Sequence, residues 1–243
     1  MNPISEKVAQ KTFVEITKKI KSTKAISIAI CPPTLYLPLF KKNKSVSLGS
    51  QNVFYEKEGA YTGEISVQML KDLGVKYVLV GHSERRMLGE NNEDISKKIS
   101  TILKAGLLPI VCVGEKERDA EHKYLQFVEQ EIKSACSLVS KNLIPKMIFA
   151  YEPIWAIGKD ALRQATSEEA REMGIFIHKV ISDISTPNIS KSVKILYGGS
   201  VDEKNAGEFI KNGGMDGLLV GRASLNANQF SKLVESTGKI KNK

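Results

Sequence analysis

The sequence has few of the residues from which disulfide frameworks and metal centres are built. Only three cysteines and three histidines occur among 243 residues. The cysteines, Cys31, Cys112 and Cys136, lie far apart and form no C-x-x-C pair, which argues against disulfides and against a zinc site. The histidines also lack metal-ligand spacing. The sequence therefore predicts a reduced chain that holds no metal.

Long apolar runs are also missing. No stretch of about 18 apolar residues occurs, so the sequence predicts no membrane span. The N-terminus lacks the basic-then-apolar pattern of a secretory signal, so nothing marks the chain for export. Together with the unpaired cysteines, these absences favour a cytoplasmic location.

Arginine is scarce although the chain is basic. A net charge of +9 and a pI of about 9.3 would suit a nucleic-acid partner. However, only six of the 36 basic residues are Arg, and the lysines are scattered over helix-like segments such as residues 15–24 and the tail 238–243. Surfaces that contact phosphates usually gather their Arg and Lys. We therefore expect no nucleic-acid partner and interpret the charge as a solvated, Lys-rich surface.

The chain does contain short apolar stretches that alternate with amphipathic helix patterns. Most of these stretches are continuously apolar, as parallel strands buried on both faces are. The alternation predicts a parallel sheet with right-handed crossovers, either an eight-fold barrel or an open doubly wound sheet. No linker divides the chain, so we expect residues 1–243 to form one domain. Seven strands are predicted, at residues 25–30, 45–50, 77–81, 108–114, 147–151, 193–199 and 216–222.

The N-terminus departs from this alternation because it opens directly as a helix. Asn2 suits the N-cap and Pro3 the first helical position. One apolar face follows at helical spacing, formed by Ala9, Phe13, Ile16 and Ile20. No strand precedes this helix, so seven strands follow where a closed barrel needs eight.

Two predicted strands end in residues that can move protons. Glu152 follows the strand at 147–151, and His82 follows the strand at 77–81. In a parallel barrel the C-terminal ends of all strands meet on the face where catalysis occurs, so we expect these side chains to share a small substrate as base and electrophile. Taken singly, a strand-end Glu is also compatible with a salt bridge or a cap, and a strand-end His with a structural hydrogen bond.

Two further strand ends are rich in glycine. Residues 197–200 ("YGGS") and 220–224 ("VGRAS") follow the last two predicted strands. Glycine lets backbone N–H groups approach an anion closely, and loops after the last strands of a barrel are a common phosphate site. An ordinary tight turn explains either loop alone, but it explains the pair less well.

Six ordered motifs resemble the triosephosphate isomerase family: "QNV…GAYTGEIS", "VGHSERR", "CVGE", "AYEPIWAIG", "YGGSV" and "GLLVGRASL". The resemblance implies an α/β fold of the TIM (βα)8 barrel type and interconversion of dihydroxyacetone phosphate and glyceraldehyde 3-phosphate. It implies that Glu152 is the base, that His82 is a neutral imidazole polarising the carbonyl, and that Glu84 belongs to the same site. The substrate phosphate would be held by backbone N–H groups at Gly158, Ser200, Gly221 and Arg222.

The resemblance also implies a lid and a partner subunit. Residues 153–166 resemble the family's lid, with Trp155 and Ile157 as packing residues. The loop "GAYTGEIS" resembles one that inserts into a second subunit, which places Thr62 near the partner's site and implies a homodimer. No metal or organic cofactor is implied, because proton transfer by Glu and His needs none.

The sequence departs from the family at its start. The family's first strand ends in Asn-x-Lys-Met-Asn, and its Lys touches the substrate, whereas this chain begins with Met1-Asn2. We therefore expect unpaired strand edges near 25–30 and 216–222, impaired turnover by the 243 residues, and a native chain that starts upstream. A non-catalytic phosphosugar-binding or interaction protein on a degenerate barrel is the alternative. A metal-dependent phosphosugar barrel enzyme is a third, opposed by the lack of several His and Asp ligands.

Two smaller departures concern the phosphate loop and the lid. Arg222 stands where the family usually has a second Gly, and its cation is expected near the phosphate. The lid is longer than usual and lacks its second Gly.

Overall fold

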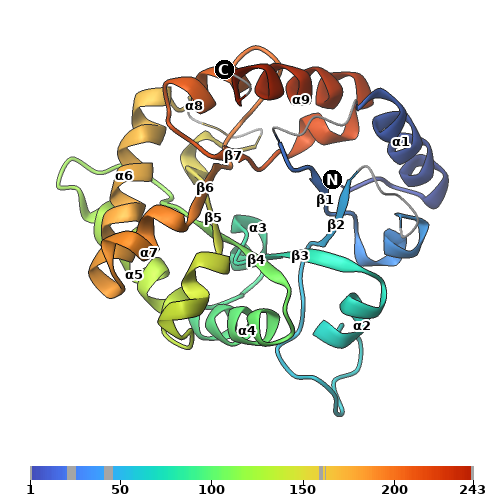
Figure 1. Cartoon of the computed structure of the whole chain (residues 1–243), viewed down its shortest axis with the longest axis horizontal. Helices are drawn as coiled ribbons and strands as arrows, with labels where there is room; N and C mark the ends of the chain where they lie inside the picture. Colours follow the sequence, from blue (N-terminus) through green and yellow to red (C-terminus); the bar gives the residue numbers. More distant parts are fainter. Residues whose placement is uncertain (1, 21–25, 41–45, 159–160, 162, 242–243) are drawn as a thin grey trace.

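Seven parallel strands form one sheet whose neighbours follow chain order, from β1 to β7. The computed structural model describes residues 2–20, 26–40, 46–158, 161 and 163–241. Figure 1 shows the sheet curled into an incomplete ring with helices around its outside. The prediction of a seven-stranded α/β barrel is confirmed, and the doubly wound alternative is wrong, because that fold reverses its strand order at a switch point.

The strands are β1 (Ala29–Ile30), β2 (Ser47–Ser50), β3 (Val75–Val80), β4 (Leu108–Val113), β5 (Ile148–Tyr151), β6 (Lys194–Tyr197) and β7 (Gly217–Leu218). The α-helices are α1 (Glu6–Lys19), α2 (Val67–Asp72), α3 (Ser83–Met87), α4 (Asn92–Lys104), α5 (Lys123–Cys136), α6 (Ser167–Ile184), α7 (Pro187–Ser192), α8 (Ala206–Lys211) and α9 (Ala227–Lys241). Short 3-10 helices are η1 (Thr34–Phe40), η2 (Lys141–Lys146), η3 (Ile154–Ala156) and η4 (Arg222–Leu225).

The middle strands are buried on both faces. Side chains that alternate along them point either into the ring or outward under the helices. The inward set forms a small core of Tyr77, Leu79, Ile110, Cys112 and Ala150, whereas the outward set joins a larger core shared with the helices. Burial on both faces explains why these strands read as continuous apolar runs.

The two terminal strands are short. β1 and β7 have two residues each and stand at opposite ends of the sheet, and no pairing joins them within the residues that the structure describes. The expectation of unpaired edges near 25–30 and 216–222 is confirmed. The inner core of the barrel is more exposed to solvent near these terminal strands. Three side chains that contact it there are only partly buried: Cys31, Leu196 and Leu219.

The helix ring is more complete than the strand ring. In Figure 1, α1 lies beside α9, so helices from opposite ends of the chain pack together. The predicted apolar face of α1 is confirmed, since Ala9, Phe13, Ile16 and Ile20 are all buried.

The predicted start of this helix was wrong. Ser5 is the N-cap, not Asn2, and its Oγ accepts a hydrogen bond from the Val8 N–H at 3.3 Å. The helix therefore begins at Glu6, whose carboxylate favours the positive end of the helix dipole, and Pro3 lies before the helix.

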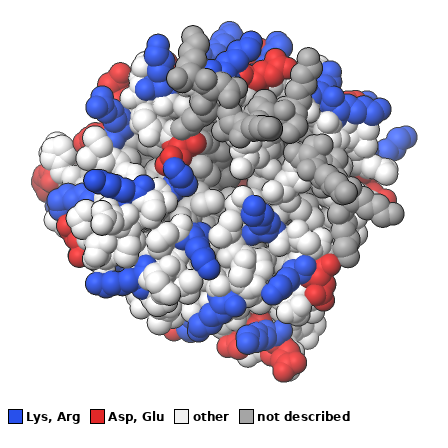
Figure 2. Space-filling view, viewed as in Figure 1, with Lys and Arg blue, Asp and Glu red and all other residues white. Residues whose placement is uncertain are grey.

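Within the described ranges, no helix combines the length and the apolar character that crossing a membrane requires. Figure 2 shows Lys and Arg side chains spread over the viewed face, with neutral surface between them. That residues 1–243 form one domain stays a prediction.

Candidate active site

His82 is held by the backbone at the start of α3. Gly81 turns the chain with φ +72° after β3, and His82 then serves as the N-cap of the helix. The imidazole Nδ1 accepts the Glu84 N–H at 3.3 Å. Because an accepting nitrogen carries no proton, the proton of the neutral ring lies on Nε2. The ring therefore presents an N–H donor on its other side.

Glu152 stands at the end of β5 and faces this donor. Its backbone N–H donates to the Val113 carbonyl at 2.8 Å, which fixes the residue against the end of β4. Its carboxylate Oε2 accepts the Ser83 N–H at 3.0 Å, and Oε1 lies 3.0 Å from His82 Nε2. The structure thus brings together the two residues that the sequence predicted at separate strand ends.

The Glu152 carboxylate sits in an unusual environment for a charged group. Its residue is only 2% exposed. Burial raises the pKa of this carboxyl, and the neighbouring His82 and the Ser83 N–H partly offset that shift. The Cys112 thiol also lies beside it, with its own pKa raised by burial and by the carboxylate. A buried carboxylate with a raised pKa is a stronger base than an exposed one.

The two glycine-rich loops reach the segment that follows Glu152. The Ser200 hydroxyl donates to the Ala156 carbonyl at 2.8 Å. Arg222 donates from Nη2 to the Gly158 carbonyl at 3.1 Å, and Gly221 precedes it at the start of η4. The four residues expected at a phosphate therefore lie on three converging segments.

Comparison with known proteins bears on this arrangement. The triosephosphate isomerase family model matches residues 1–237. The chain is also 42% identical over 231 residues to the triosephosphate isomerase of Dictyoglomus thermophilum, covering 93% of this chain and 91% of that protein. This chain belongs to the triosephosphate isomerase family. Membership makes it an isomerase, as the motifs indicated.

Two residues that the family resemblance singled out have exposed side chains. The Glu84 side chain is 80% exposed, and its Oε2 lies 3.9 Å from His82 Nδ1. That approach is longer than the hydrogen bond from the Glu84 backbone, so the backbone contact decides the tautomer. Thr62 is exposed in the loop between β2 and α2. Of the longer lid, residues 159, 160 and 162 lie outside the described residues.

Sequence reasoning missed the role of Glu115, which follows β4. This residue is 1% exposed. Its Oε1 accepts from the Tyr151 hydroxyl at 2.7 Å, from Trp155 Nε1 at 2.8 Å and from Arg118 Nε at 3.2 Å. The signal was present, because Glu115 ends an apolar strand in "CVGE" just as Glu152 ends one in "AYE". Among the described residues, no group of three or more potential metal ligands occurs.

Proposed function

We propose that the chain interconverts dihydroxyacetone phosphate and D-glyceraldehyde 3-phosphate through an enediolate. The observation that carries this proposal is the 3.0 Å contact between the buried Glu152 carboxylate and the Nε2 side of His82. A base and a hydrogen-bond donor so placed can act on adjacent atoms of one three-carbon molecule.

The chemistry needs both groups. Glu152 takes a proton from the carbon beside the carbonyl, and His82 Nε2–H donates to the carbonyl oxygen as negative charge develops there. The same carboxyl then returns the proton to the neighbouring carbon, while His82 relays the hydroxyl proton between the two oxygens. The carbon skeleton and the electron count are unchanged, so the reaction needs no cofactor.

The phosphate half holds the substrate by its other end. Backbone N–H groups of Gly158, Ser200, Gly221 and Arg222 bind the phosphate in this proposal, as the converging segments support. In this proposal the segment that follows Glu152, with Trp155, covers the reacting atoms and excludes water, which protects the enediolate from losing phosphate. Glu84 belongs to the site through His82, whose Nδ1 accepts the Glu84 backbone N–H and lies 3.9 Å from the Glu84 carboxylate.

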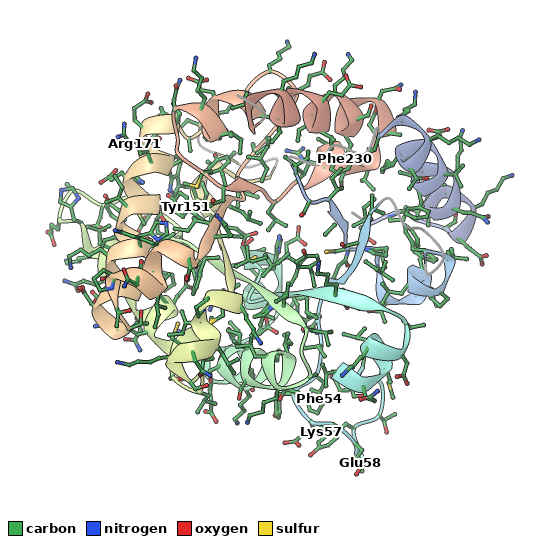
Figure 3. The ribbon with its side chains drawn as sticks, viewed as in Figure 1. Phe54, Lys57, Glu58, Tyr151, Arg171 and Phe230 are labelled. Carbon is green, nitrogen blue, oxygen red and sulfur yellow. The ribbon has the colours of Figure 1, made fainter. Side chains whose placement is uncertain are left out.

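We further propose a homodimer in the cytoplasm. Figure 3 shows the loop that carries Phe54, Lys57 and Glu58 projecting from the body, and Thr62 lies in the same loop. Leu88, beside α3, is 81% exposed, an apolar surface suited to a second subunit. Sedimentation equilibrium of the purified chain tests this; a monomer at micromolar concentration contradicts it.

The direct test is turnover of glyceraldehyde 3-phosphate in D₂O, followed by NMR. Proton transfer through Glu152 predicts deuterium at the carbon beside the product carbonyl. Absence of product and of deuterium, or turnover abolished by a chelator, contradicts the proposal.

A further inference from the structure

Arg163 forms a two-pronged ion pair at the start of α6. Its Nη1 lies 2.9 Å from Glu169 Oε2, and its Nη2 lies 2.5 Å from Glu169 Oε1. The pKa of the Glu169 carboxyl is lowered to about 2, and the largest cause is its hydrogen bonding to Arg163. Glu169 is itself fixed by a capping box, since Oε2 accepts the Thr166 N–H at 2.8 Å while the Glu169 N–H donates to Thr166 Oγ1 at 3.1 Å. The guanidinium is therefore anchored to a rigid helix end.

The same guanidinium lies on the ring of Trp155. Its central carbon is 4.4 Å from the ring centroid, within the range of a cation–π contact. On its polar edge, Trp155 donates from Nε1 to Glu115 Oε1 at 2.8 Å. Trp155 is 6% exposed. The indole is thus held on its face by a cation and at its edge by a buried carboxylate.

Arg163 and Glu115 thus form a clamp on Trp155, which lies three residues after Glu152, the proposed catalytic base. The Ile154 N–H donates to the Glu115 carbonyl at 3.0 Å, so Glu115 holds the segment after Glu152 by both its backbone and its side chain. A shift of Trp155 away from Glu115 would pull on Pro153 and Glu152 directly. Catalysis by a positioned base is sensitive to such shifts.

We propose that Arg163 is a positioning residue that fixes the Glu152 carboxylate by clamping Trp155 between its guanidinium and Glu115. The catalytic part of this inference rests on the proposed function. Arg163 touches none of the reacting atoms. Its side chain is 53% exposed, so the ion pair contributes little to overall stability, and the capping box of α6 persists without it.

The clamp itself can be tested without turnover because Trp155 is the only tryptophan of the chain. The variants are Arg163→Gln, Arg163→Lys and, as matched control, Arg171→Gln; Arg171 lies exposed on α6 (Figure 3). Arg163→Gln should shift Trp155 emission to longer wavelength and increase its quenching by acrylamide. Arg163→Lys, which keeps the charge but not the planar fork, should lie between, and Arg171→Gln should match the parent chain.

The position of Glu152 has a separate readout in the ¹⁵N shifts of the His82 imidazole. Those signals are assigned by their loss in His82→Gln. Arg163→Gln should move the Nε2 shift, because its partner Glu152 Oε1 moves, and Arg171→Gln should leave it in place. In the isomerase assay, Arg163→Gln should lower kcat about 10- to 100-fold and change KM by less than about twofold.

Each outcome decides the proposal. Unchanged Trp155 fluorescence in Arg163→Gln overturns the clamp. Altered fluorescence with an unmoved His82 Nε2 shift overturns the positioning role, as does loss of activity through KM alone. If the parent chain shows no turnover, the proposed function fails, and the fluorescence and ¹⁵N shifts still decide whether Arg163 positions Glu152.

Discussion

Glu152 and His82 follow β5 and β3, which have a strand on each side. Gly221 and Arg222 follow β7, which pairs only with β6 among the strands that the structure describes. β3 and β5 have mostly buried residues, and Glu152 is tied to Val113 and Ser83 by backbone N–H groups. Both residues of β7 are half-buried, and Gly221 and Arg222 are exposed. The proton-transfer half of the site is therefore enclosed, whereas the part of the phosphate half that follows β7 stands at a sheet edge; we call this part the open half.

This difference shows that one fold can prepare two parts of a site to different degrees. A strand with two neighbours has its backbone fixed along both edges, so residues at its end inherit that rigidity. A strand with one neighbour leaves N–H and C=O groups unpaired, and the loop after it has fewer constraints. Substitutions in the enclosed half should therefore have larger effects than matched substitutions at the open half.

The largest effect is expected for Glu152→Gln. Loss of the base should lower kcat about 100- to 10,000-fold, which steady-state assays measure. The stability of the folded chain should not decrease. Burial raises the folded-state pKa of Glu152 above the usual 4.5, so its contribution to stability is present below 4.5 and is lost as pH rises through the raised value. The neutral Gln should therefore keep or raise the Tm at pH 7.

Glu235→Gln is the matched control for this change, since Glu235 is exposed on α9. It should leave both kcat and Tm unchanged. Retention of most activity by Glu152→Gln would remove Glu152 from the mechanism. A Tm well below that of the parent chain would instead show that the buried carboxylate stabilises the fold.

The enclosed half was also the part that sequence reasoning predicted best. Continuous apolar runs marked β3 and β5, and the rule that parallel strands end on one face placed His82 beside Glu152. The hydrogen bonds to Glu115 were not predicted, because the periodicity of the sequence does not show that the side chains of Tyr151 and Trp155 converge on its carboxylate. The short length of β7 escaped as well, since strand ends depend on pairing with neighbours rather than on local propensity.

Glycine-to-alanine substitutions compare how strongly each half of the site affects the free energy of unfolding. A Cβ added at Gly114 would lie 1.8 Å from the Glu152 carbonyl oxygen, a backbone atom that cannot move without displacing β5. Gly114→Ala should therefore lower the free energy of unfolding by about 1–3 kcal/mol or more, measured by urea denaturation. It should lower kcat too, because the displaced carbonyl belongs to the catalytic base.

Gly221→Ala is the counterpart in the open half. A Cβ there meets no described atom within 4 Å. Its free energy of unfolding should stay within about 0.5 kcal/mol of the parent chain, as for other exposed substitutions. Equal destabilisation by the two alanines would contradict the contrast between an enclosed and an open half.

The smallest effect is expected for Arg222→Gly, which tests the open half by its charge. Arg222 holds the Gly158 carbonyl at 3.1 Å and places a cation beside the proposed phosphate loop. Because the side chain is exposed, its loss should raise KM only about two- to fivefold, with a smaller change in kcat. Arg222→Lys keeps the charge and should restore most of the affinity at low salt, where exposed charges are least screened. An unchanged or lower KM in Arg222→Gly would show that the phosphate is held by backbone N–H groups alone, so that the side chain serves only to hold the segment at Gly158.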